Sequence, residues 1–376
     1  MAGSLGSDKR GAWLRLAGVL LAGLLRSQVV SASEPLLPVH VVAVGDLGFR
    51  RQVGIDIAAG SGQPLAAVQK QLAADLSFAN LETVLSRRAL PDPVAARRFP
   101  IVQGPPQGAQ YLARSGFDVV SVANNHAFDF YAAGFLDTLR ALDEAGVRAI
   151  GGGRTPEQAL RPFVQTIRGV RIGMLALASG VNRAPHGPAA VAWVWHPASL
   201  AAIRALRPQV DVLLVSVHWG IEGVFVASDK QRQRAHALIQ AGADVILGHH
   251  PHVLQSVEVF QQRLIVYSLG NFLFGKQPLP RRQTVILHLR VAAGPQPIVD
   301  VRFDPVLISP QTEQPEPATG EAAAAIRRRL RDSSQRFNLR WTEQGESLIL
   351  GGPWTTAPAT ATAPDPAPRR APAQPG

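Results

Sequence analysis

The residues best suited to chemistry lie in one short stretch, where an apolar run ends in the three histidines His249, His250 and His252. The run Val245–Leu247 predicts a buried strand, and Gly248 is expected to turn the chain off its end, so that the imidazoles share one small volume. Neutral imidazoles bind Zn, Mn, Fe and Ni well, and a strand end holds them rigidly. The stretch predicts a metal site; a solvated turn is the alternative.

Polar side chains recur at the ends of other apolar runs, and because the carboxyl ends of parallel strands meet at one edge of a sheet, they are expected to gather there. Each alone is explained by a helix cap, a surface charge or a core histidine, so the recurrence carries the prediction. The mixed set suits one or two borderline divalent ions, Mn, Zn, Fe or Ni, better than Ca or Mg alone. These strand-end residues are Asp46, Glu82, Asn125, His126 and His218.

One pair in this set predicts acid–base chemistry rather than metal binding. Asp129 follows His126 by three residues, within reach of its ring on a helical turn. A carboxylate there would fix the imidazole tautomer and prepare the ring to donate a proton to a leaving group. We therefore predict His126 and Asp129 as catalytic, with a helix-capping arrangement as the alternative.

The elements that must position these groups alternate between apolar strands and amphipathic helices, which predicts an α/β fold with one main body. Strands are predicted at 39–44, 76–79, 117–122, 163–167, 170–177, 212–217, 245–247, 264–269, 284–291 and 299–307. Helices are predicted at 64–75, 107–115, 136–145, 229–241 and 321–331.

The composition narrows the kinds of chemistry and of partner. The chain has no cysteine, which excludes thiolate metal sites, disulfides and cysteine nucleophiles. Its net charge of +11 comes almost entirely from arginine, which suits phosphate and carboxylate groups and favours a polyanionic partner. Nucleic acid is not expected, because the arginine pairs are dispersed and no recognition motif accompanies them. Codon bias is an alternative source of the arginines.

The two ends of the chain differ from the body in composition. Residues 1–32 are predicted to be a signal peptide, with Lys9 and Arg10 before an apolar core at Leu16–Leu25 and small residues at Val30–Ala32. Arg15 shortens the apolar run, so cleavage near Ser33 and export to the periplasm or beyond are favoured over a permanent N-terminal anchor. The main domain is predicted at 38–309. Residues 310–376 are predicted to be a linker, a short basic helix and a disordered tail.

Six motifs resemble, in order and spacing, those of the CapA family, which is associated with poly-γ-glutamate capsule synthesis or export. They extend from about Val41 to Gly275 and comprise GD at Asp46, NLE at Asn80–Glu82, ANNHxxD at Ala123–Asp129, HWGxE at His218–Glu222, GHHPHV at Gly248–Val253 and YSLGNF at Tyr267–Phe272. That family is similar to the calcineurin-like metallophosphoesterases. The resemblance implies a four-layer α-β-β-α sandwich, with two sheets flanked by helices and a two-metal site at the strand ends.

The resemblance also implies roles for individual residues. Asp46 matches the first metal-binding aspartate, Glu82 the bridging carboxylate, Asn125 the amide ligand and His126 the proton donor with Asp129 as its partner. His218, His249, His250 and His252 are expected to complete the metal sites, although the sequence does not decide between His249 and His250. Beside them, Asn80, Asn124, Glu222 and Asn271 are predicted to bind substrate.

Two positions depart from the family patterns. The metallophosphoesterase pattern has a histidine two residues after the first aspartate, where this chain has Gly48, so one metal position is expected to be weak or empty. The CapA motif usually has glycine two residues after the aspartate of NNHxxD, where this chain has Tyr131, so the loop beside the site is expected to differ.

Two functions from different classes follow. The first is an exported, metal-dependent hydrolase acting on a phosphoester or on an amide-linked anionic polymer. The second is a non-catalytic polymer-binding or export component, working with membrane-bound polyglutamate synthesis machinery, in which the metal site is structural or degenerate. Gly48 favours the second function, whereas Asn125, His126 and Asp129 favour the first.

Overall fold

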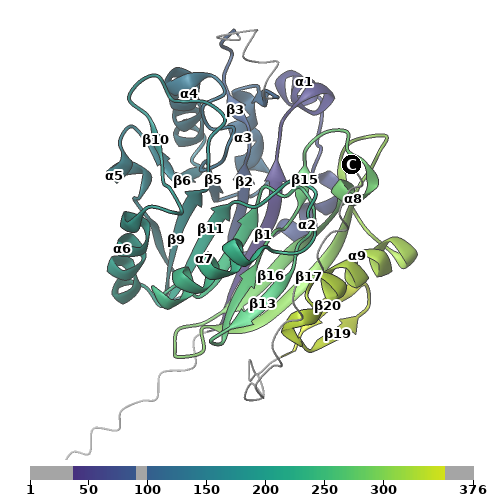
Figure 1. Cartoon of the computed structure of the whole chain (residues 1–376). Coiled ribbons are helices and arrows are strands. Elements are labelled where there is room, and N and C mark those ends of the chain that lie inside the picture. The colour runs from purple at the N-terminus through teal and green to yellow at the C-terminus, as the bar shows by residue number, and fades with distance from the viewer. Residues whose placement is uncertain (1–36, 90–99, 352–376) are drawn as a thin grey trace, which may run out of the picture. The chain divides into compact units, whose positions relative to one another are not determined.

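The computed structural model describes residues 37–89 and 100–351, which form two large β-sheets with helices around them (Figure 1). The predicted signal peptide and the end of the predicted tail, after residue 351, lie outside these described ranges. Within the ranges, no helix combines the length and the apolar character that crossing a membrane requires.

The first sheet supplies half of the strand ends at which the predicted site residues lie. It consists of β1 (Val39–Leu47), β2 (Leu76–Leu81), β5 (Val119–Ser121), β6 (Arg148–Ile150), β15 (Asn271–Leu273), β16 (Gln283–Val291), β17 (Ile298–Ile308), β18 (Pro315–Pro317), β19 (Trp341–Gln344) and β20 (Ser347–Leu350). Its order is β19-β20-β17-β16-β1-β2-β5-β6, with β15 paired to β1 and β18 to β17. Strands β1, β2, β5 and β6 run parallel, so their carboxyl ends share one edge.

The second sheet supplies the other half. It consists of β8 (Phe163–Ile167), β9 (Val170–Ala178), β11 (Val212–His218), β12 (Val245–His249), β13 (Val257–Phe260) and β14 (Arg263–Val266), in the order β13-β14-β12-β11-β9-β8. Strands β9, β11, β12 and β14 run parallel. The hairpin expected at 163–177 is confirmed by the antiparallel pair β8–β9. Two short ribbons pair β3 (Val84–Leu85) with β4 (Gln103–Gly104) and β7 (Gly152–Gly153) with β10 (Ala190–Val191).

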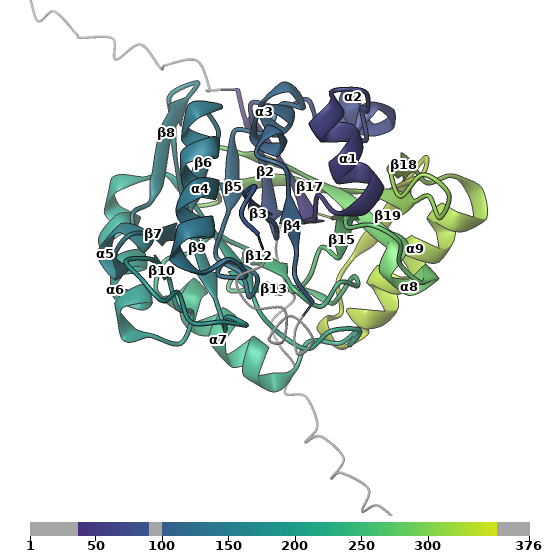
Figure 2. The same cartoon turned by 90° about the horizontal axis from the view of Figure 1, so that it is seen from above.

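Helices cover the outer faces of the two sheets, which confirms the four-layer arrangement. They are α1 (Arg51–Ala59), α2 (Gln69–Leu72), α3 (Gln107–Arg114), α4 (Tyr131–Glu144), α5 (Pro156–Ala159), α6 (Pro197–Leu206), α7 (Asp229–Gln240), α8 (Leu279–Arg282) and α9 (Gly320–Ser333). Figure 2 shows α1, α3 and α4 on one side of the strands and α7 on the other. Leu238 of α7 and Ile203 of α6 pack in one cluster with Leu213 of β11, on the outer face of the second sheet.

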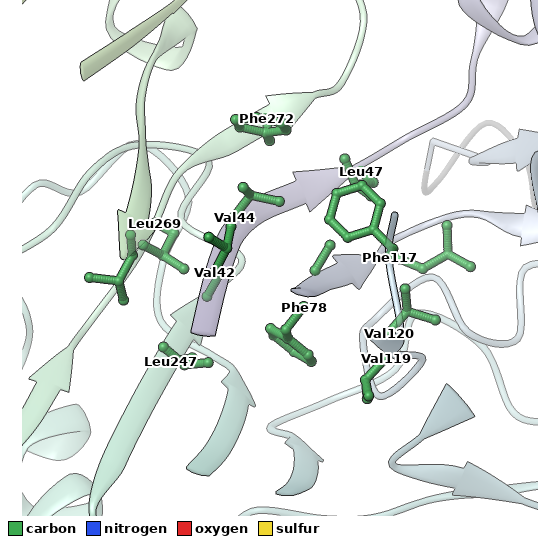
Figure 3. Packing of buried hydrophobic residues seen from close by; sticks show 14 of the residues in the cluster. Val42, Val44, Leu47, Phe78, Phe117, Val119, Val120, Leu247, Leu269 and Phe272 are labelled. Atoms are coloured by element: carbon green, nitrogen blue, oxygen red, sulfur yellow. The ribbon is translucent and has the colours of Figure 1, made fainter. Parts of the chain in front are cut away.

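The core lies between the two sheets and on their helix-covered faces. Val41 of β1 and Leu247 of β12 belong to one buried cluster that joins the sheets. Figure 3 shows part of it, with side chains from β1, β2, β5 and β12. Strands buried on both faces read as unbroken apolar runs, which explains why periodicity identified them from the sequence.

The first helices differ from the prediction. The segment 64–75, expected to be one helix, holds a 3-10 turn at Ala66–Val68 and the short α2, because the backbone becomes extended at Ala73 before β2 begins. Helix α1 was not predicted. It buries Val53, Gly54 and Ile57, too few apolar positions for a clear helical period.

The domain boundary near residue 309 was wrong, because the packed body continues to residue 351. Strand β18 pairs with β17, and β20 also pairs with β17, so residues after 310 extend the first sheet. Helix α9 buries Ile326 and Leu330 in the main core. Its end bonds to the second sheet, where Ser256 Oγ donates to Ser333 O at 2.6 Å and Val257 N donates to Ser334 Oγ at 2.7 Å. The segment is polar overall, but Ile326, Leu330, Leu348 and Leu350 are buried in the core.

Candidate metal centre

The predicted ligands come together at the carboxyl ends of parallel strands from the two sheets. From the first sheet, Asp46 lies near the end of β1, Glu82 follows β2, and Asn125 and His126 lie in the loop after β5. From the second sheet, His218 and His249 are the last residues of β11 and β12, and His250 and His252 follow. Because the two sheets face each other, predicted ligands that are spread over more than 200 positions of the chain come together in space.

Asp46, Glu82 and His252 form the first possible ligand group. One ligand atom from each lies within 4.8 Å of the others, and all three side chains are buried. His252 Nδ1 lies 3.4 Å from Asp46 Oδ2, and His252 Nε2 lies 3.8 Å from Glu82 Oε1. Two carboxylates and an imidazole at these distances leave room for a cation between them.

Glu82, His218 and His250 form the second group by the same measure. His218 Nε2 lies 3.6 Å from Glu82 Oε1 and 3.1 Å from His250 Nδ1. Asn125 Oδ1 is 2.8 Å from the same His218 nitrogen, so the amide oxygen adds a fourth donor. Glu82 belongs to both groups, which is the arrangement expected of a bridging carboxylate.

Glu82 provides the test of whether these residues fit a metal ion. Its side chain is fully buried, and neither Oε1 nor Oε2 has a hydrogen-bond partner among the described residues. Burial, and then the nearby Asp46 carboxylate, raise the pKa of Glu82 well above its ordinary value. A buried carboxylate is stable in its ionised form only beside a compensating positive charge, so the donor set fits a divalent cation.

The histidines of the second group are in the protonation state that a metal requires. Burial, and then His250, lower the pKa of His218 well below its ordinary value. Burial, and then His252, lower the pKa of His250 to about 4. Both rings are therefore neutral at pH 7, and the neutral imidazole is the ligand form. Burial alone would raise the pKa of Asp46, but His249 and His252 hold it well below its ordinary value.

His249 belongs to neither group, although it was predicted as a ligand with the other histidines. It is the last residue of β12, is fully buried, and its ring lies 6.0 Å from that of Phe78. His249 Nδ1 lies 3.3 Å from Asp46 Oδ1. Between the two residues that the sequence left open, the geometry favours His250 as the ligand and places His249 against Asp46.

The backbone reaches this geometry in a way that the sequence did not predict. Gly248 was expected to turn the chain, but it lies inside β12, and a Cβ there would meet Tyr267 O at 1.9 Å. Glycine is needed for this close approach of two backbones. The turn occurs at His250 and His252, whose φ angles of 96° and 56° are unusual for residues other than glycine. Backbone strain of this kind concentrates at functional sites.

The predicted catalytic pair is in contact. His126 Nδ1 lies 2.7 Å from Asp129 Oδ2, and the same carboxylate oxygen accepts a hydrogen bond from Val102 N at 2.9 Å. His126 Nε2 lies 3.8 Å from Glu82 Oε1. The ring is therefore oriented by Asp129 on one side and faces the possible metal ligands with its other nitrogen.

Of the four residues predicted to bind substrate, the three asparagines form hydrogen bonds to other site residues instead. Asn80 Nδ2 donates to Asp46 Oδ1 at 2.9 Å, and Asn271 Oδ1 lies 2.8 Å from His252 Nδ1. Asn124 Oδ1 accepts from His126 N at 3.1 Å. All three side chains are buried, which suits orientation of the ligands rather than contact with substrate. Glu222, the fourth, is more exposed and pairs with Arg281 at 3.0 Å.

The two departures from the family patterns have different structural outcomes. A Cβ on Gly48 would lie 2.7 Å from the ring of Phe274, which in turn packs 4.6 Å from the His252 ring. Phe274 thus fills the space beside the first ligand group where a histidine would need to stand. Tyr131 adopts φ 54°, so it keeps the left-handed backbone that glycine favours, and its ring packs edge-on against His186.

The sequence did not reveal one segment of the site, the loop between β9 and β10. Asn182 N donates to Asn125 O at 2.8 Å, and Asn125 Nδ2 donates to Asn182 Oδ1 at 3.4 Å. The neighbouring Arg183 is buried. No strand-end pattern marks this loop, and only its concentration of glycine and proline set it apart.

Two packed sheets with outer helices and a carboxylate–imidazole centre at their strand ends define a four-layer α/β protein with a candidate metal centre. Within that class, the chain belongs to the bacterial capsule synthesis protein family PGA_cap, whose profile matches residues 40–276. The resemblance found in the motifs is thereby confirmed.

Known proteins similar to this chain include two from bacilli. The capsule biosynthesis protein CapA of Bacillus anthracis is 30% identical over 248 residues, 64% of this chain and 59% of that protein. The PGA biosynthesis protein CapA of Bacillus subtilis (strain 168) is 34% identical over 195 residues, 49% of this chain and 50% of that protein. The matched part thus spans only 50–59% of these relatives' length. A solved 5'-nucleotidase from Candida albicans is 11% identical, with a TM-score of 0.39 over 82% of this chain and 60% of that chain.

Proposed function

We propose that this protein is a metal-dependent hydrolase of the CapA type, which acts on an anionic polymer of the poly-γ-glutamate kind or on a phosphoester. One observation carries the proposal. A single buried oxygen, Glu82 Oε1, lies 3.6 Å from His218, 3.8 Å from His252 and 3.8 Å from His126. Two possible ligand groups and a possible proton donor thus share one carboxylate.

The two ligand groups suit one or two borderline ions such as Mn, Zn, Fe or Ni. When bound, such an ion supplies Lewis acidity and stabilises negative charge on the reacting group. One position would use Asp46, Glu82 and His252, and the other Glu82, Asn125, His218 and His250. His249 and Asn80 would hold Asp46 in place.

The proposed proton donor is His126. Its Nδ1 is occupied by Asp129, so Nε2 is the atom that gives a proton to the leaving group. Asp129 keeps the ring in that tautomer, and the Val102 backbone N–H keeps Asp129 in place. General acid catalysis of this kind contributes roughly 100-fold to 10,000-fold in rate.

A second function, a non-catalytic polymer-binding or export component, is favoured by one observation. Phe274 fills the space at Gly48, so the first ligand group has three protein donors and lacks a fourth from β1. A weakened position there would suit a structural ion. The two functions therefore differ in whether His126 affects turnover.

The test compares His252→Ala, His126→Ala and Asp129→Asn, with His196→Ala, at the exposed N-cap of α6, as the control for loss of an imidazole in metal content and hydrolysis. Loss of a ligand should lower metal content and thermal stability together in His252→Ala. His126→Ala should keep its metal and lose roughly 100-fold or more in hydrolysis, with a smaller loss in Asp129→Asn. Unchanged hydrolysis in His126→Ala, over a screen of phosphodiesters and γ-glutamyl substrates, would favour the polymer-binding function.

We also propose that the mature protein is exported to the periplasm or beyond, and that it works beside membrane-bound polyglutamate synthesis machinery. The basic start and short apolar run of residues 1–32 support export. N-terminal sequencing of the exported form should begin near Ser33. Recovery of an intact Met1 in salt-resistant membrane pellets would instead support an anchor.

A further inference from the structure

Arg183, in the loop between β9 and β10, is a buried charge that the proposed chemistry has not used. Its side chain is 9% exposed, and its Nε and Nη2 atoms have no hydrogen-bond partner among the described residues. A guanidinium stays protonated at any ordinary pH, so it cannot relieve this situation by losing its proton. A buried and unpaired charge is costly, and proteins keep one where a ligand compensates it.

The loop that carries Arg183 is fixed along the loop that carries the proposed proton donor. On one side of Arg183, Asn182 N donates to Asn125 O at 2.8 Å. On the other side, Pro185 O accepts from Ala132 N at 2.5 Å. These two attachments bracket the segment 126–131 of the neighbouring loop, so Arg183 is held beside the segment that contains His126 and Asp129.

The same loop is also attached to the second ligand group. Ser179, which follows β9, donates its backbone N–H to His218 O at 2.9 Å. Asn125, which Asn182 contacts, places its Oδ1 2.8 Å from His218 Nε2. Arg183 is therefore four positions along the chain from Ser179, which is bonded to a proposed ligand, and backbone hydrogen bonds fix the position of the main chain that carries it.

Arg50 adds a second positive charge on the β1 side of the centre. Its side chain is only partly exposed. Burial, and then Arg51, lower the pKa of Arg50, while the carboxylates of Asp129, Glu313 and Glu82 act in the opposite direction. The Arg50 guanidinium is thus within electrostatic range of Glu82 and Asp129, so a positive charge lies near the centre on the β1 side.

We propose that Arg183 binds an anionic oxygen of the substrate, a phosphate or a carboxylate next to the bond that is cut, and that it makes the centre selective for polyanions. A guanidinium binds either oxyanion through two parallel hydrogen bonds, and Nε and Nη2 of Arg183, which have no hydrogen-bond partner among the described residues, are two such donors. The inference rests on the proposed function only in assuming that this centre receives a substrate; binding at Arg183 does not require hydrolysis.

The experiment uses the full chain with Arg183→Gln, Arg183→Lys and, as a matched control, Arg204→Gln on the exposed surface of α6. Calorimetry would measure binding of inorganic phosphate and of a γ-linked glutamate oligomer. Loss of a charge-assisted pair should weaken binding by roughly 10- to 100-fold in Arg183→Gln, with an intermediate loss in Arg183→Lys. The anion with the larger loss identifies the source of the oxyanion, and Arg204→Gln should match the wild type.

Thermal unfolding separates this role from a structural one. A residue that holds the fold should lose stability when replaced, whereas removal of an uncompensated buried charge should leave the melting temperature unchanged or higher. A large fall in both Arg183 variants would overturn the proposal. So would unchanged affinity for both anions, or failure of the wild type to bind either one.

Combined with the hydrolysis of His126→Ala, these measurements keep this inference distinct from the proposed hydrolase. Binding that depends on Arg183 in a chain whose hydrolysis does not depend on His126 would support the anion site and reject the hydrolase. Hydrolysis that depends on His126, with anion binding indifferent to Arg183, would do the reverse. Metal content should be equal in all Arg183 variants, because Arg183 is not a proposed ligand.

Discussion

Two regions of this molecule bury an arginine to nearly the same extent, but only one of them pairs its charge with carboxylates. In the C-terminal unit of α9, β19 and β20, Arg327 is 8% exposed, donates to Glu346 at 2.8 Å and lies 3.2 Å from Glu343. Beside the candidate metal centre, Arg183 is 9% exposed and has no such partner among the described residues. Arg327 is thus paired with carboxylates of its own unit, as expected of a charge that helps to hold the fold.

The centre leaves charges of both signs without partners. Glu82 is a buried carboxylate and Arg183 a buried guanidinium, and both oxygens of Glu82 and Nε and Nη2 of Arg183 lack a hydrogen-bond partner among the described residues. The backbone is also strained there, at His250 and His252. Regions that break the rules of burial and backbone geometry are expected to be those that bind ligands. The comparison therefore distinguishes a structural region from a functional one without reference to any relative.

The largest expected effect comes from removing the C-terminal unit. A chain that ends at Ser309 would lose Ile326, Leu330, Leu348 and Leu350, all buried in the main core. Each is worth roughly 1.5–3 kcal/mol when buried, and together they approach the ~5–15 kcal/mol by which domains are stable. We expect no cooperative melting by circular dichroism, whereas a chain ending at 351 should melt like the full chain. A cooperative melt of the shorter chain would show that the C-terminal unit is not needed for folding.

A smaller effect is expected from filling space at the centre. The Cβ of Gly48→Ala would lie 2.7 Å from the Phe274 ring, which is too close without a shift of the ring. Overpacking of this kind costs roughly 1–3 kcal/mol. The matched change in the C-terminal unit is Gly351→Ala, whose Cβ would make ordinary contacts at 3.5 Å and beyond. Urea unfolding should show a lower free energy of unfolding for Gly48→Ala only. Equal free energies for the two variants would mean that the Phe274 ring moves aside at little cost.

The two arginines provide the direct comparison. Arg327→Met removes hydrogen bonds to charged partners and should cost about 1–2 kcal/mol, at the lower end because Glu343 and Glu346 are 41% and 44% exposed and regain water. Arg183→Met should cost nothing or increase stability. Urea unfolding of both variants measures the difference. A loss in Arg183→Met as large as that in Arg327→Met would show that both arginines are structural.

The smallest effect concerns acid stability on the structural side. Burial raises the pKa of Asp304, but His288 and Ser347 outweigh it and hold that pKa below its ordinary value. A lowered folded-state pKa stabilises the protein above the unfolded value of about 3.9, and this contribution disappears as the pH falls through the folded value. Asp304→Asn should therefore lose less stability than the wild type between about pH 5 and about pH 3. The exposed Asp143→Asn should keep the wild-type slope.

Local pattern alone predicted a large part of this protein. Strands buried on both faces produce unbroken apolar runs, and a polar residue at the end of each run is visible without any knowledge of what lies opposite. That is why Asp46, Glu82, Asn125 and His218 were found as site residues, and why the four-layer fold followed once their motifs were recognised. Helix α7 was found for the same reason, because its period and its capping box at Ser228 and Gln231 are local.

The rest depended on contacts between distant parts of the chain. His249 and His250 are neighbours in sequence, but the extended backbone of β12 directs His249 towards Asp46, and the left-handed turn at His250 directs its ring towards His218. Arg183 carries no local signal, because what marks it is the lack of a partner in a buried place. The sequence determined which residues are available as ligands and in what order they occur. Only the packing of the two sheets decided which side chains meet, because burial and pairing are properties of a position in space.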